Sequence, residues 1–136
     1  MKNITQKDKE LIKECFSQLE KNNDYDNSPF SNKASIVRAK SGKIYPGINL
    51  ALWYGACAEV IAIGNAIANG ERELDCIVSS GYDKDNKPVI LASCGNCRQL
   101  MARHCPNIDI IIEIDGKYKK VKVKEILPYG FEPTSR

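Results

Sequence analysis

The amino-acid sequence predicts a layered α/β sandwich built on a mixed sheet. Segments of helical period alternate with strand-forming segments along the chain, which is the pattern of helices packed on a sheet. Turn signals at Ser41-Gly42 and Asp115-Gly116 each stand between two strand-forming segments and add antiparallel hairpins. The 136 residues, 43% of them hydrophobic and 27% charged, suit one compact domain over residues 1–136.

The first third of the chain predicts one helix and one hairpin. Residues 5–20 form an amphipathic helix with Thr5 as its cap, because the apolar residues fall on one face. Those apolar residues are Leu11, Ile12, Cys15, Phe16 and Leu19. Residues 21–29 are rich in turn formers and carry no period, so they form a loop. Strands over residues 34–38 and 44–50 then make the first hairpin.

The rest of the chain alternates between helices and strands. The segment from Cys57 to Ala68 is apolar nearly all round, which is typical of a helix buried in a core, and Asn69-Gly70 ends it. A second helix covers residues 95–104 and is ended by Pro106. The predicted strands are residues 74–79, 89–92, 108–114 and 118–123.

Composition and charge disfavour several classes of protein. The N-terminus lacks the apolar run of a signal peptide, and no stretch approaches the roughly twenty apolar residues of a membrane helix, so we expect a cytoplasmic protein with no membrane partner. The net charge of +3 is modest. Its one concentrated source, residues 117–124, alternates lysine with valine as on a strand with one solvated face. No interleaved arginine and aromatic residues accompany these lysines, which disfavours a nucleic-acid partner.

The six cysteines divide into two groups. Without a secretion signal they should stay reduced, so a Cys-x-x-Cys pair indicates metal or redox chemistry instead of a disulfide. One group consists of Cys15, Cys76 and Cys105, which stand singly among apolar neighbours and which we interpret as small buried residues. The other group has the spacing of metal ligands.

This second group predicts a catalytic zinc site with a glutamate beside it. The residues are Cys57, Cys94, Cys97 and Glu59. Three thiolates leave a tetrahedral zinc one ligand short, and an open position is typical of a metal that activates water. Glu59 is two residues from a ligand and is placed to handle the protons of that water. The cysteines stand at predicted helix starts, where the helix dipole lowers the pKa of a thiol. Arg98 is a candidate to compensate the charge of the thiolates.

Two short motifs resemble the cytidine deaminase superfamily. They are Cys57-Ala58-Glu59 and the segment Cys-Gly-Asn-Cys-Arg-Gln at residues 94–99, which match the ligand-x-Glu and Cys-x-x-Cys signature of zinc deaminases. The similarity extends to Ser28-Pro29-Phe30-Ser31, to residues 42–49 and to residues 125–131. It therefore covers most of the chain.

The resemblance implies a three-layer α/β/α sandwich with a mixed five-stranded sheet and one Zn²⁺ per chain, held by the three cysteines. Glu59 would remove a proton from water and return protons to N3 and to the departing amine, so that a cytosine ring releases ammonia and becomes uracil. The implied substrate-binding residues are Asn49, Ala58, Ser31 and Phe131. Small deaminases of this superfamily are homotetramers in which neighbouring subunits complete each pocket, so we expect a homotetramer that acts on a small-molecule nucleoside.

Within the superfamily, the chain is more similar to blasticidin-S deaminases than to ordinary cytidine deaminases. Val60 stands where the ordinary enzymes carry arginine, and Ala51 stands where their ribose-binding carboxylate is expected. The ending at residues 127–131 also resembles the blasticidin branch. Ser93 and Lys33 depart from the pattern, because the superfamily usually has proline and phenylalanine there. The expected function is hydrolytic deamination of a cytosine-ring nucleoside, with ordinary cytidine or deoxycytidine deamination as the alternative.

Two other kinds of protein stay open as alternatives. A structural zinc module needs a fourth protein ligand, for which His104, the one histidine, is the candidate. His104 lies near the end of the predicted second helix, where the dipole favours it, and a structural site would leave Glu59 without a purpose. A deaminase of bases in RNA or DNA needs a groove for flanking nucleotides, for which this chain is small and weakly basic.

Overall fold

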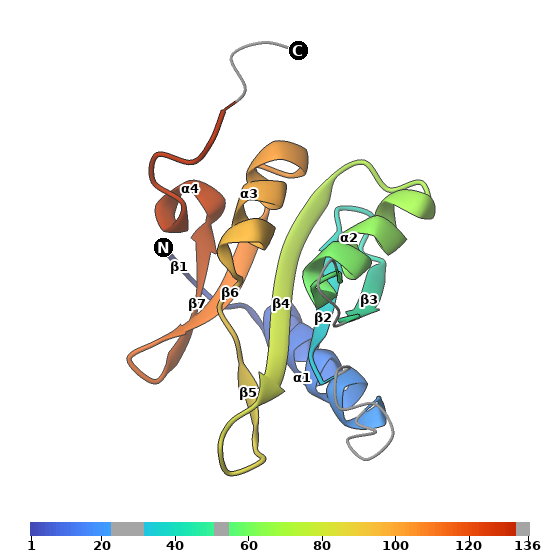
Figure 1. Cartoon of the computed structure of the whole chain (residues 1–136), viewed down its shortest axis with the longest axis vertical. Coiled ribbons are helices and arrows are strands. Elements are labelled where there is room, and N and C mark those ends of the chain that lie inside the picture. The colour runs from blue at the N-terminus through green and yellow to red at the C-terminus, as the bar shows by residue number, and fades with distance from the viewer. Residues whose placement is uncertain (23–31, 51–54, 133–136) are drawn as a thin grey trace.

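The computed structural model describes residues 1–22, 32–50 and 55–132 (Figure 1). In chain order the elements are β1 (Lys2–Asn3), α1 (Gln6–Lys21), β2 (Ala34–Ala39), β3 (Ile44–Ile48), α2 (Ala58–Ala68), β4 (Leu74–Tyr82), β5 (Pro88–Ile90), α3 (Gly95–His104), β6 (Asp109–Ile114), β7 (Lys117–Lys122) and α4 (Val123–Ile126). They follow the predicted order, with β1 and α4 added. Within these residues, no helix has both the length and the apolar character needed to cross a membrane.

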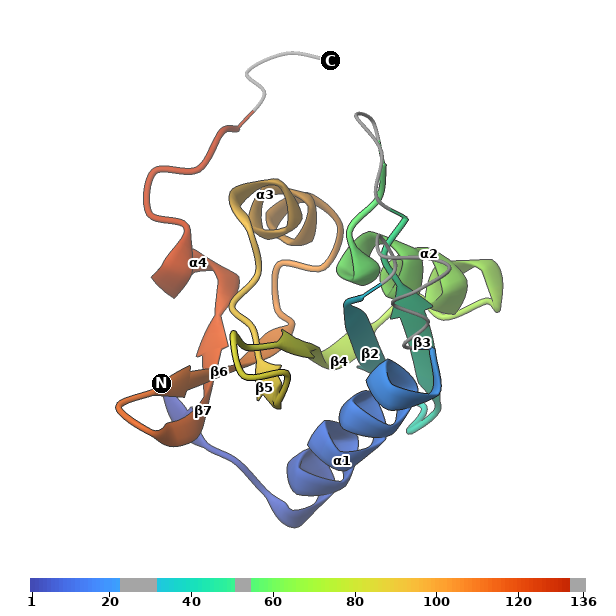
Figure 2. The ribbon, with the colours of Figure 1, turned by 60° about the horizontal axis from the view of Figure 1, so that its bottom comes forward.

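The elements form three layers (Figures 1 and 2). The middle layer is a seven-stranded sheet in the order β1-β7-β6-β4-β2-β3, with β5 paired to the end of β4. Its neighbouring strands are antiparallel except β4 and β6, which are parallel. α1 covers one face of the sheet, and α2 and α3 cover the other (Figure 2). The predicted α/β/α sandwich with a mixed sheet is confirmed, but the sheet has seven strands instead of five.

The two shortest strands of the sheet are β1 and β5. β1 has two residues and pairs with β7 from the other end of the chain, with Lys2 opposite Lys120. A strand of two residues has no period that a sequence pattern can reveal. β5 has three residues and overlaps the strand predicted for residues 89–92. β1 forms one edge of the sheet, and β5 pairs with β4 alone.

Each face of the sheet has its own apolar core. Successive residues of β2 show this division, because Ile36 packs under α1 whereas Val37 packs under α2 and α3. β4 divides in the same way, with Val78 on the α1 side and Ile77 on the other. Side chains of a strand alternate between its two faces, so a central strand must be apolar on both. The single cysteines Cys15, Cys76 and Cys105 are buried, as predicted.

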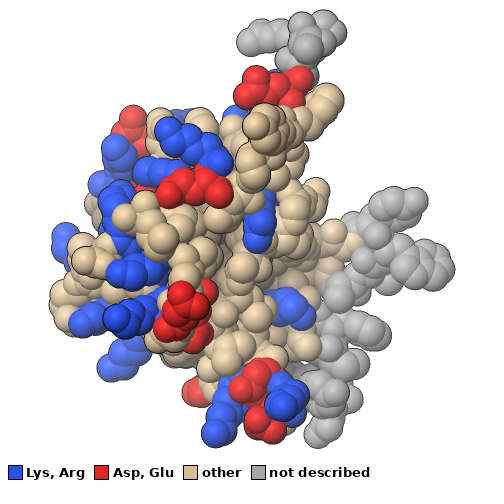
Figure 3. Space-filling view, turned by 90° about the vertical axis from the view of Figure 1, so that its left-hand side faces the viewer, with Lys and Arg blue, Asp and Glu red and all other residues tan. Residues whose placement is uncertain are grey.

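A buried ion-pair network ties α1 to the sheet. Thr5 caps α1, as predicted: its hydroxyl accepts a hydrogen bond from the N–H of Asp8 at 3.3 Å, and the Asp8 carboxylate accepts one from the N–H of Thr5 at 2.8 Å. Asp8 is fully buried, and its two oxygens pair with Arg38 at 3.0 Å and with Lys120 at 2.8 Å. Lys120 is therefore an exception to the solvated face predicted for residues 117–124. Figure 3 shows other basic side chains gathered on this side of the molecule.

The start of α2 lies against the backbone of β3. A Cβ atom added to Gly47 would stand 2.3 Å from the carbonyl oxygen of Ala58 and 2.4 Å from the backbone nitrogen of Ala62. Glycine is needed here because any side chain would push the helix away from the strand. Gly47 thereby sets the position of the first turn of α2, which begins after Cys57 and carries Glu59.

Candidate metal centre and adjoining pocket

Two helix starts bring the predicted cysteines together. α2 and α3 lie on the same face of the sheet and contact each other (Figure 2). Cys57 is the N-cap residue of α2 and Cys94 is the N-cap residue of α3, and neither side chain caps its own helix. Cys97 follows in the first turn of α3. The sulfur atoms from the two helix starts can therefore bind one shared metal ion.

The geometry of the three sulfur atoms fits a zinc ion. All three lie within 4.8 Å of one another, and the sulfur atoms of Cys57 and Cys94 are 3.7 Å apart. Two thiolates bound at about 2.3 Å to a tetrahedral zinc stand about 3.8 Å apart, so this separation needs little adjustment. Among the described residues, no fourth cysteine, histidine or carboxylate completes the group. The donor set is that of an open site with three thiolates.

The electrostatics of the three thiols also favour a cation. Burial raises the pKa of Cys97 far above its ordinary value, and the charge of Glu59 and the other two sulfur atoms raise it further. Burial likewise raises the pKa of Cys57. At Cys94 burial again opposes ionisation, but hydrogen bonds from the backbone N–H of Cys97 and from the Cys57 thiol outweigh it and lower the pKa. A divalent cation would stabilise all three thiolates and displace their remaining protons.

Glu59 is a buried carboxylate in the first turn of α2. It is 7% exposed and forms no ion pair or hydrogen bond with another described residue. The free N–H groups at the start of the helix favour its negative charge. A buried carboxylate without a cation partner is costly in a purely structural role, so its place beside the cysteine cluster indicates chemistry.

A cavity of about 330 Å³ opens beside the cysteine cluster. The residues that line it are Lys33, Asn49, Leu50, Gly55, Ala56, Cys57, Ala58, Glu59, Ser79, Ser80, Leu91, Ala92 and Cys94. The wall is mostly apolar, with a few polar groups contributed by the ends of strands and the start of α2. This composition and size are typical of a site for a small molecule.

Two of the predicted substrate-binding residues line this cavity. Asn49 and Ala58 both belong to its wall, and the Asn49 side-chain oxygen accepts a hydrogen bond from the N–H of Lys33 at 2.9 Å. Ser31 and Ala51 lie outside the described residues.

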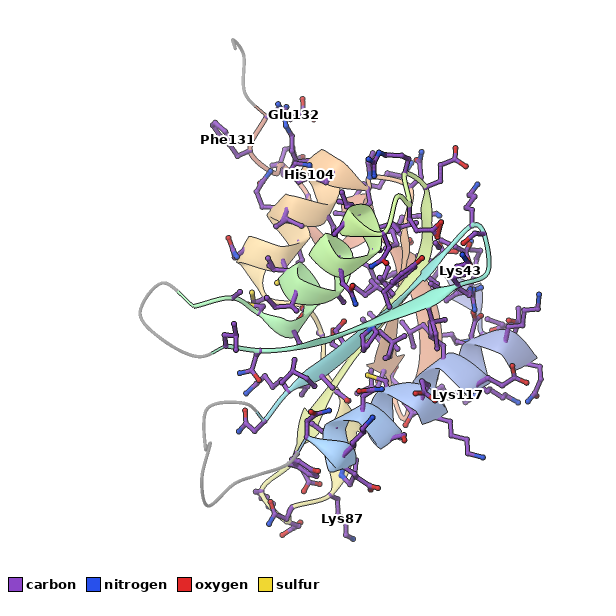
Figure 4. All side chains as sticks on the ribbon, turned by 90° about the vertical axis from the view of Figure 1, so that its right-hand side faces the viewer. Lys43, Lys87, His104, Lys117, Phe131 and Glu132 are labelled. Carbon is purple, nitrogen blue, oxygen red and sulfur yellow. The ribbon has the colours of Figure 1, made fainter. Side chains whose placement is uncertain are left out.

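The fourth predicted residue, Phe131, does not reach the cavity within one chain. The Gln99 side chain forms two hydrogen bonds of 2.8 Å with the backbone of Phe131, one to its N–H and one to its carbonyl. Phe131 is 72% exposed and lies beyond α4, near the end of the described chain (Figure 4). The prediction that Phe131 contacts a substrate is therefore not met by the pocket of its own chain.

Arg98 donates its hydrogen bonds to backbone carbonyls. Its Nε–H bonds the carbonyl of Ser93 at 2.7 Å, and its Nη1 bonds the carbonyl of Ile126 at 2.9 Å. Arg98 thereby connects Ser93, the residue before Cys94, to Ile126 of α4 and fixes the backbone that leads into the cysteine cluster. The hydrogen bond to a ligand sulfur that would accompany charge compensation is not among the contacts of Arg98.

His104 does not close the cysteine cluster. It is exposed at the last residue of α3, whereas Cys94 precedes the first residue of that helix (Figure 4). A helix of ten residues is about 15 Å long, which separates His104 from the sulfur atoms. The alternative of a structural site completed by His104 is therefore wrong.

The sequence interpretation missed two serines in the cavity wall. Ser79 and Ser80 lie near the end of β4, and the Ser79 hydroxyl donates to the hydroxyl of Ser35 at 3.1 Å. The signal was a pair of polar residues ending an apolar strand and followed by Gly81. A Cβ atom on Gly81 would stand 2.6 Å from Cδ1 of Leu91, so the glycine gives Leu91 its place in the wall.

The chain matches known proteins over most of its length. Residues 5–111 match the family model of the cytidine and deoxycytidylate deaminase zinc-binding region. A blasticidin-S deaminase from Bacillus cereus is 30% identical over 139 residues, which cover 95% of this chain and 95% of that protein. A cytidine deaminase from Shewanella woodyi is 32% identical over 107 residues, which cover 74% of this chain and 32% of that longer protein.

Solved structures of cytidine deaminases share the fold. The enzyme from Burkholderia pseudomallei superposes with a TM-score of 0.71 at 24% identity, covering 94% of this chain and 100% of that chain. The enzyme from Mycobacterium leprae gives a TM-score of 0.68 at 22% identity, covering 92% of this chain and 99% of that chain. At these identities the likeness concerns the arrangement of helices and strands.

Proposed function

The chain belongs to the cytidine and deoxycytidylate deaminase family of zinc-binding hydrolases, and from that premise we propose that it deaminates a cytosine-ring nucleoside. The reaction replaces the 4-amino group by a carbonyl and releases ammonia. The observation that carries the proposal is the group of three cysteine sulfur atoms within 4.8 Å, with the carboxylate of Glu59 in the wall of the same cavity and without an ion pair to any described residue.

Within this family we place the activity with the blasticidin-S deaminases. The relative from Bacillus cereus aligns over 95% of both proteins, so the resemblance extends over nearly the whole length of each. The match to the Shewanella woodyi enzyme covers a smaller share of each protein. Deamination of cytidine or deoxycytidine in pyrimidine salvage is the alternative, and the same residues would perform it.

The proposed metal ligands are Cys57, Cys94 and Cys97, with one Zn²⁺ per chain. A zinc ion bound there supplies a Lewis acid that makes water a better nucleophile near neutral pH. Arg98 would support the ligands by holding the carbonyl of Ser93, directly before Cys94. Its positive charge also lies on the first turn of α3, close to Cys97 in the chain.

Glu59 is the proposed proton carrier. Its carboxylate takes a proton from the attacking water and donates a proton to N3 of the ring as the new C–O bond forms at C4. Glu59, ionised again, then takes the proton of the new C4–OH group and passes it to the departing amine, so that C4 becomes a carbonyl, the C4–N bond breaks and ammonia leaves. Asn49 and Ala58 would position the nucleoside, because both line the cavity beside Glu59. Ser31 is proposed to take part as well, on the resemblance alone.

We further propose that the whole chain forms one deaminase domain that assembles as a homotetramer in the cytoplasm. The outward side of α2 is apolar, with Ile67 41% exposed, and a Cβ atom on Gly64 would meet nothing within 4 Å in its own chain. Phe131, exposed and held by Gln99, would then contact the pocket of a neighbouring copy. The six cysteines are free thiols, as a reducing compartment would keep them.

A substrate panel tests the proposal. Purified protein with a measured zinc content is incubated with cytidine, deoxycytidine, blasticidin S and guanine, and ammonia release is followed. We expect one zinc per chain and release from the cytosine nucleosides, with blasticidin S favoured. Release from guanine alone would refute the substrate class, and one tightly held zinc with no release from any compound would indicate a structural metal.

A further inference from the structure

Lys33 is a cation in the wall of the cavity that the proposed chemistry does not use. Of the described residues that line the cavity, Lys33 is the one base and Glu59 is the one carboxylate. Lys33 forms no ion pair with any described residue, and its ammonium donates to the side-chain oxygen of Asn32 at 3.1 Å. An ammonium group has three N–H donors, so Lys33 keeps donors for a ligand.

The backbone of Lys33 is held at a defined position. Its N–H donates to the side-chain oxygen of Asn49 at 2.9 Å, and its carbonyl accepts the N–H of Asn49 at 3.2 Å. The side chain then passes Gly81, where a Cβ atom would stand 3.6 Å from Cγ of Lys33. A distance of 3.6 Å is an ordinary van der Waals contact, so the stem of Lys33 lies beside Gly81 at the cavity wall.

Lys33 and Glu59 differ in depth. Lys33 is exposed, whereas Glu59 is 7% exposed and Cys97 is fully buried. The carbon that loses its amine must lie beside Glu59 and the cysteines, so the cytosine ring occupies the buried part of the cavity. The sugar then lies toward solvent, on the side where Lys33 stands. The cytosine ring is uncharged, so a negative charge for Lys33 has to come from the sugar end.

We propose that Lys33 binds an acidic group on the sugar of the substrate, a phosphate or a carboxylate, and so selects anionic cytosine nucleosides over neutral ones. This inference rests on the proposed function and names the substrate class of that site. Three thiolates and Glu59 exceed the charge of one Zn²⁺, so the buried part of the site repels an anion. Lys33 counteracts that repulsion at the place where the acidic group would lie, and its ammonium forms a charge-assisted hydrogen bond with it.

Lys33→Gln is the variant that tests this inference, with Lys43→Gln as its matched control. Both remove one positive charge from an exposed lysine. Lys33 precedes β2 at the open end of the β2–β3 hairpin, whereas Lys43 lies at the turn at the other end (Figure 4). Glutamine at position 33 keeps the two backbone hydrogen bonds with Asn49, so the fold of the hairpin is preserved.

The substrates are cytidine, cytidine 5′-monophosphate and cytidine 5′-carboxylate. We expect the unsubstituted enzyme to prefer at least one acidic substrate, and Lys33→Gln to lower kcat/KM for it about fivefold, mainly through KM, because the contact lies away from the reacting carbon. Cytidine should change less than twofold, and Lys43→Gln should change neither. The phosphate and carboxylate arms show which acidic group fits.

The outcomes separate this inference from the proposed function. Turnover of cytidine with no preference for either acid, or an equal loss on all three substrates, overturns the role of Lys33 and leaves the deaminase intact. If no substrate releases ammonia, the proposed function fails, and calorimetric binding of uridine 5′-monophosphate and uridine decides the role of Lys33. If Lys33→Gln weakens the binding of uridine 5′-monophosphate more than that of uridine, Lys33 forms part of a site for an anion. If the unsubstituted protein binds both ligands with equal affinity, the role of Lys33 is overturned.

Discussion

Two buried charged clusters lie on opposite faces of one sheet, and they are built in opposite ways. Under α1, the carboxylate of Asp8 pairs with Arg38 and Lys120 and accepts the N–H of Thr5. Between α2 and α3, Glu59 and the three cysteines form no ion pair with a described residue, and they border a cavity. The first cluster is closed by protein groups, whereas the second is open and requires a ligand to balance it.

The pKa directions express the same difference. Burial works against ionisation of Asp8, but hydrogen bonds from Lys120, Thr5 and Arg38 outweigh it and lower the pKa to about 2. Burial raises the pKa of Cys97, and its charged neighbours raise it further because they are themselves acidic groups. A buried acid surrounded by donors supports the fold, whereas buried acids surrounded by acids mark a place for a cation.

Glu59→Gln should have the largest effect, and it acts on the open cluster alone. Glutamine keeps the size of the side chain but cannot carry protons, so ammonia release should fall about a thousandfold, within the usual range for loss of a general acid–base. Zinc content and the free energy of unfolding should stay close to those of the unsubstituted protein. The control is Glu73→Gln, an exposed glutamate outside the cavity wall. Full turnover by Glu59→Gln with zinc bound would remove Glu59 from the mechanism.

Asp8→Asn makes the reverse test on the closed cluster. Arg38 keeps its pair with Asp75, but Lys120 is left buried without its anion, and breaking a buried pair costs about 4 kcal/mol of the free energy of unfolding. Urea unfolding measures this loss. Turnover per folded molecule should be unchanged, because Asp8 is not among the residues that line the cavity. Asp85→Asn, in an exposed turn, should change the free energy by less than about 0.5 kcal/mol. A loss of turnover in folded Asp8→Asn would show that the two clusters are coupled.

Gly47→Ala tests how the fold positions the open cluster. The new methyl group meets the backbone of Ala58 and Ala62, so the first turn of α2 must move, at a cost of about 3 kcal/mol. Cys57 and Glu59 move with it, and zinc per chain should fall along with turnover. Gly64→Ala is the matched control in α2, because a Cβ atom there meets nothing in its own chain. It should retain zinc, and a change in its association state would bear on the proposed tetramer. Unchanged zinc content in Gly47→Ala would show that the cluster tolerates movement of α2.

The open cluster was more predictable from sequence than the closed one. Its ligands are close in the chain to helix starts, and the spacing of Cys94 and Cys97 alone indicates a metal, so local patterns were sufficient. The closed cluster joins Asp8, Arg38 and Lys120, which are far apart in the chain. Lys120 belongs to an alternating run that predicts a solvated face, and only the position of α1 over the sheet shows that this lysine is buried.

The same reasoning explains which site residues could be predicted. Asn49 and Ala58 follow from the resemblance because they lie next to elements that the sequence defines well. Lys33 and Ser79 line the cavity from two different places in the chain, just before β2 and in β4. They come together only because β2 pairs with β3 and β4, and local sequence patterns do not reveal that pairing. Phe131 lies beyond α4 on a segment held by Gln99, a long-range contact that no local pattern shows.

Acid should reduce the stabilisation that the closed cluster gives to the fold, by less than the Asp8→Asn substitution does. The pKa of Asp8 is about 2 in the folded protein and 3.8 ordinarily, so the unfolded chain binds the proton more readily. The network therefore contributes its full stabilisation above about pH 4, and this contribution, about 2 kcal/mol, is lost as the pH falls toward 2. Acid also displaces zinc from the thiolates, so the measurement compares urea unfolding of Asp8→Asn with that of the unsubstituted protein at pH 6, 4, 3 and 2. The loss of zinc affects both proteins alike, and the difference between their free energies should shrink below pH 4. A difference that stays constant down to pH 2 would mean that Asp8 keeps the same charge throughout, and that the contrast between the two clusters does not rest on its ionisation.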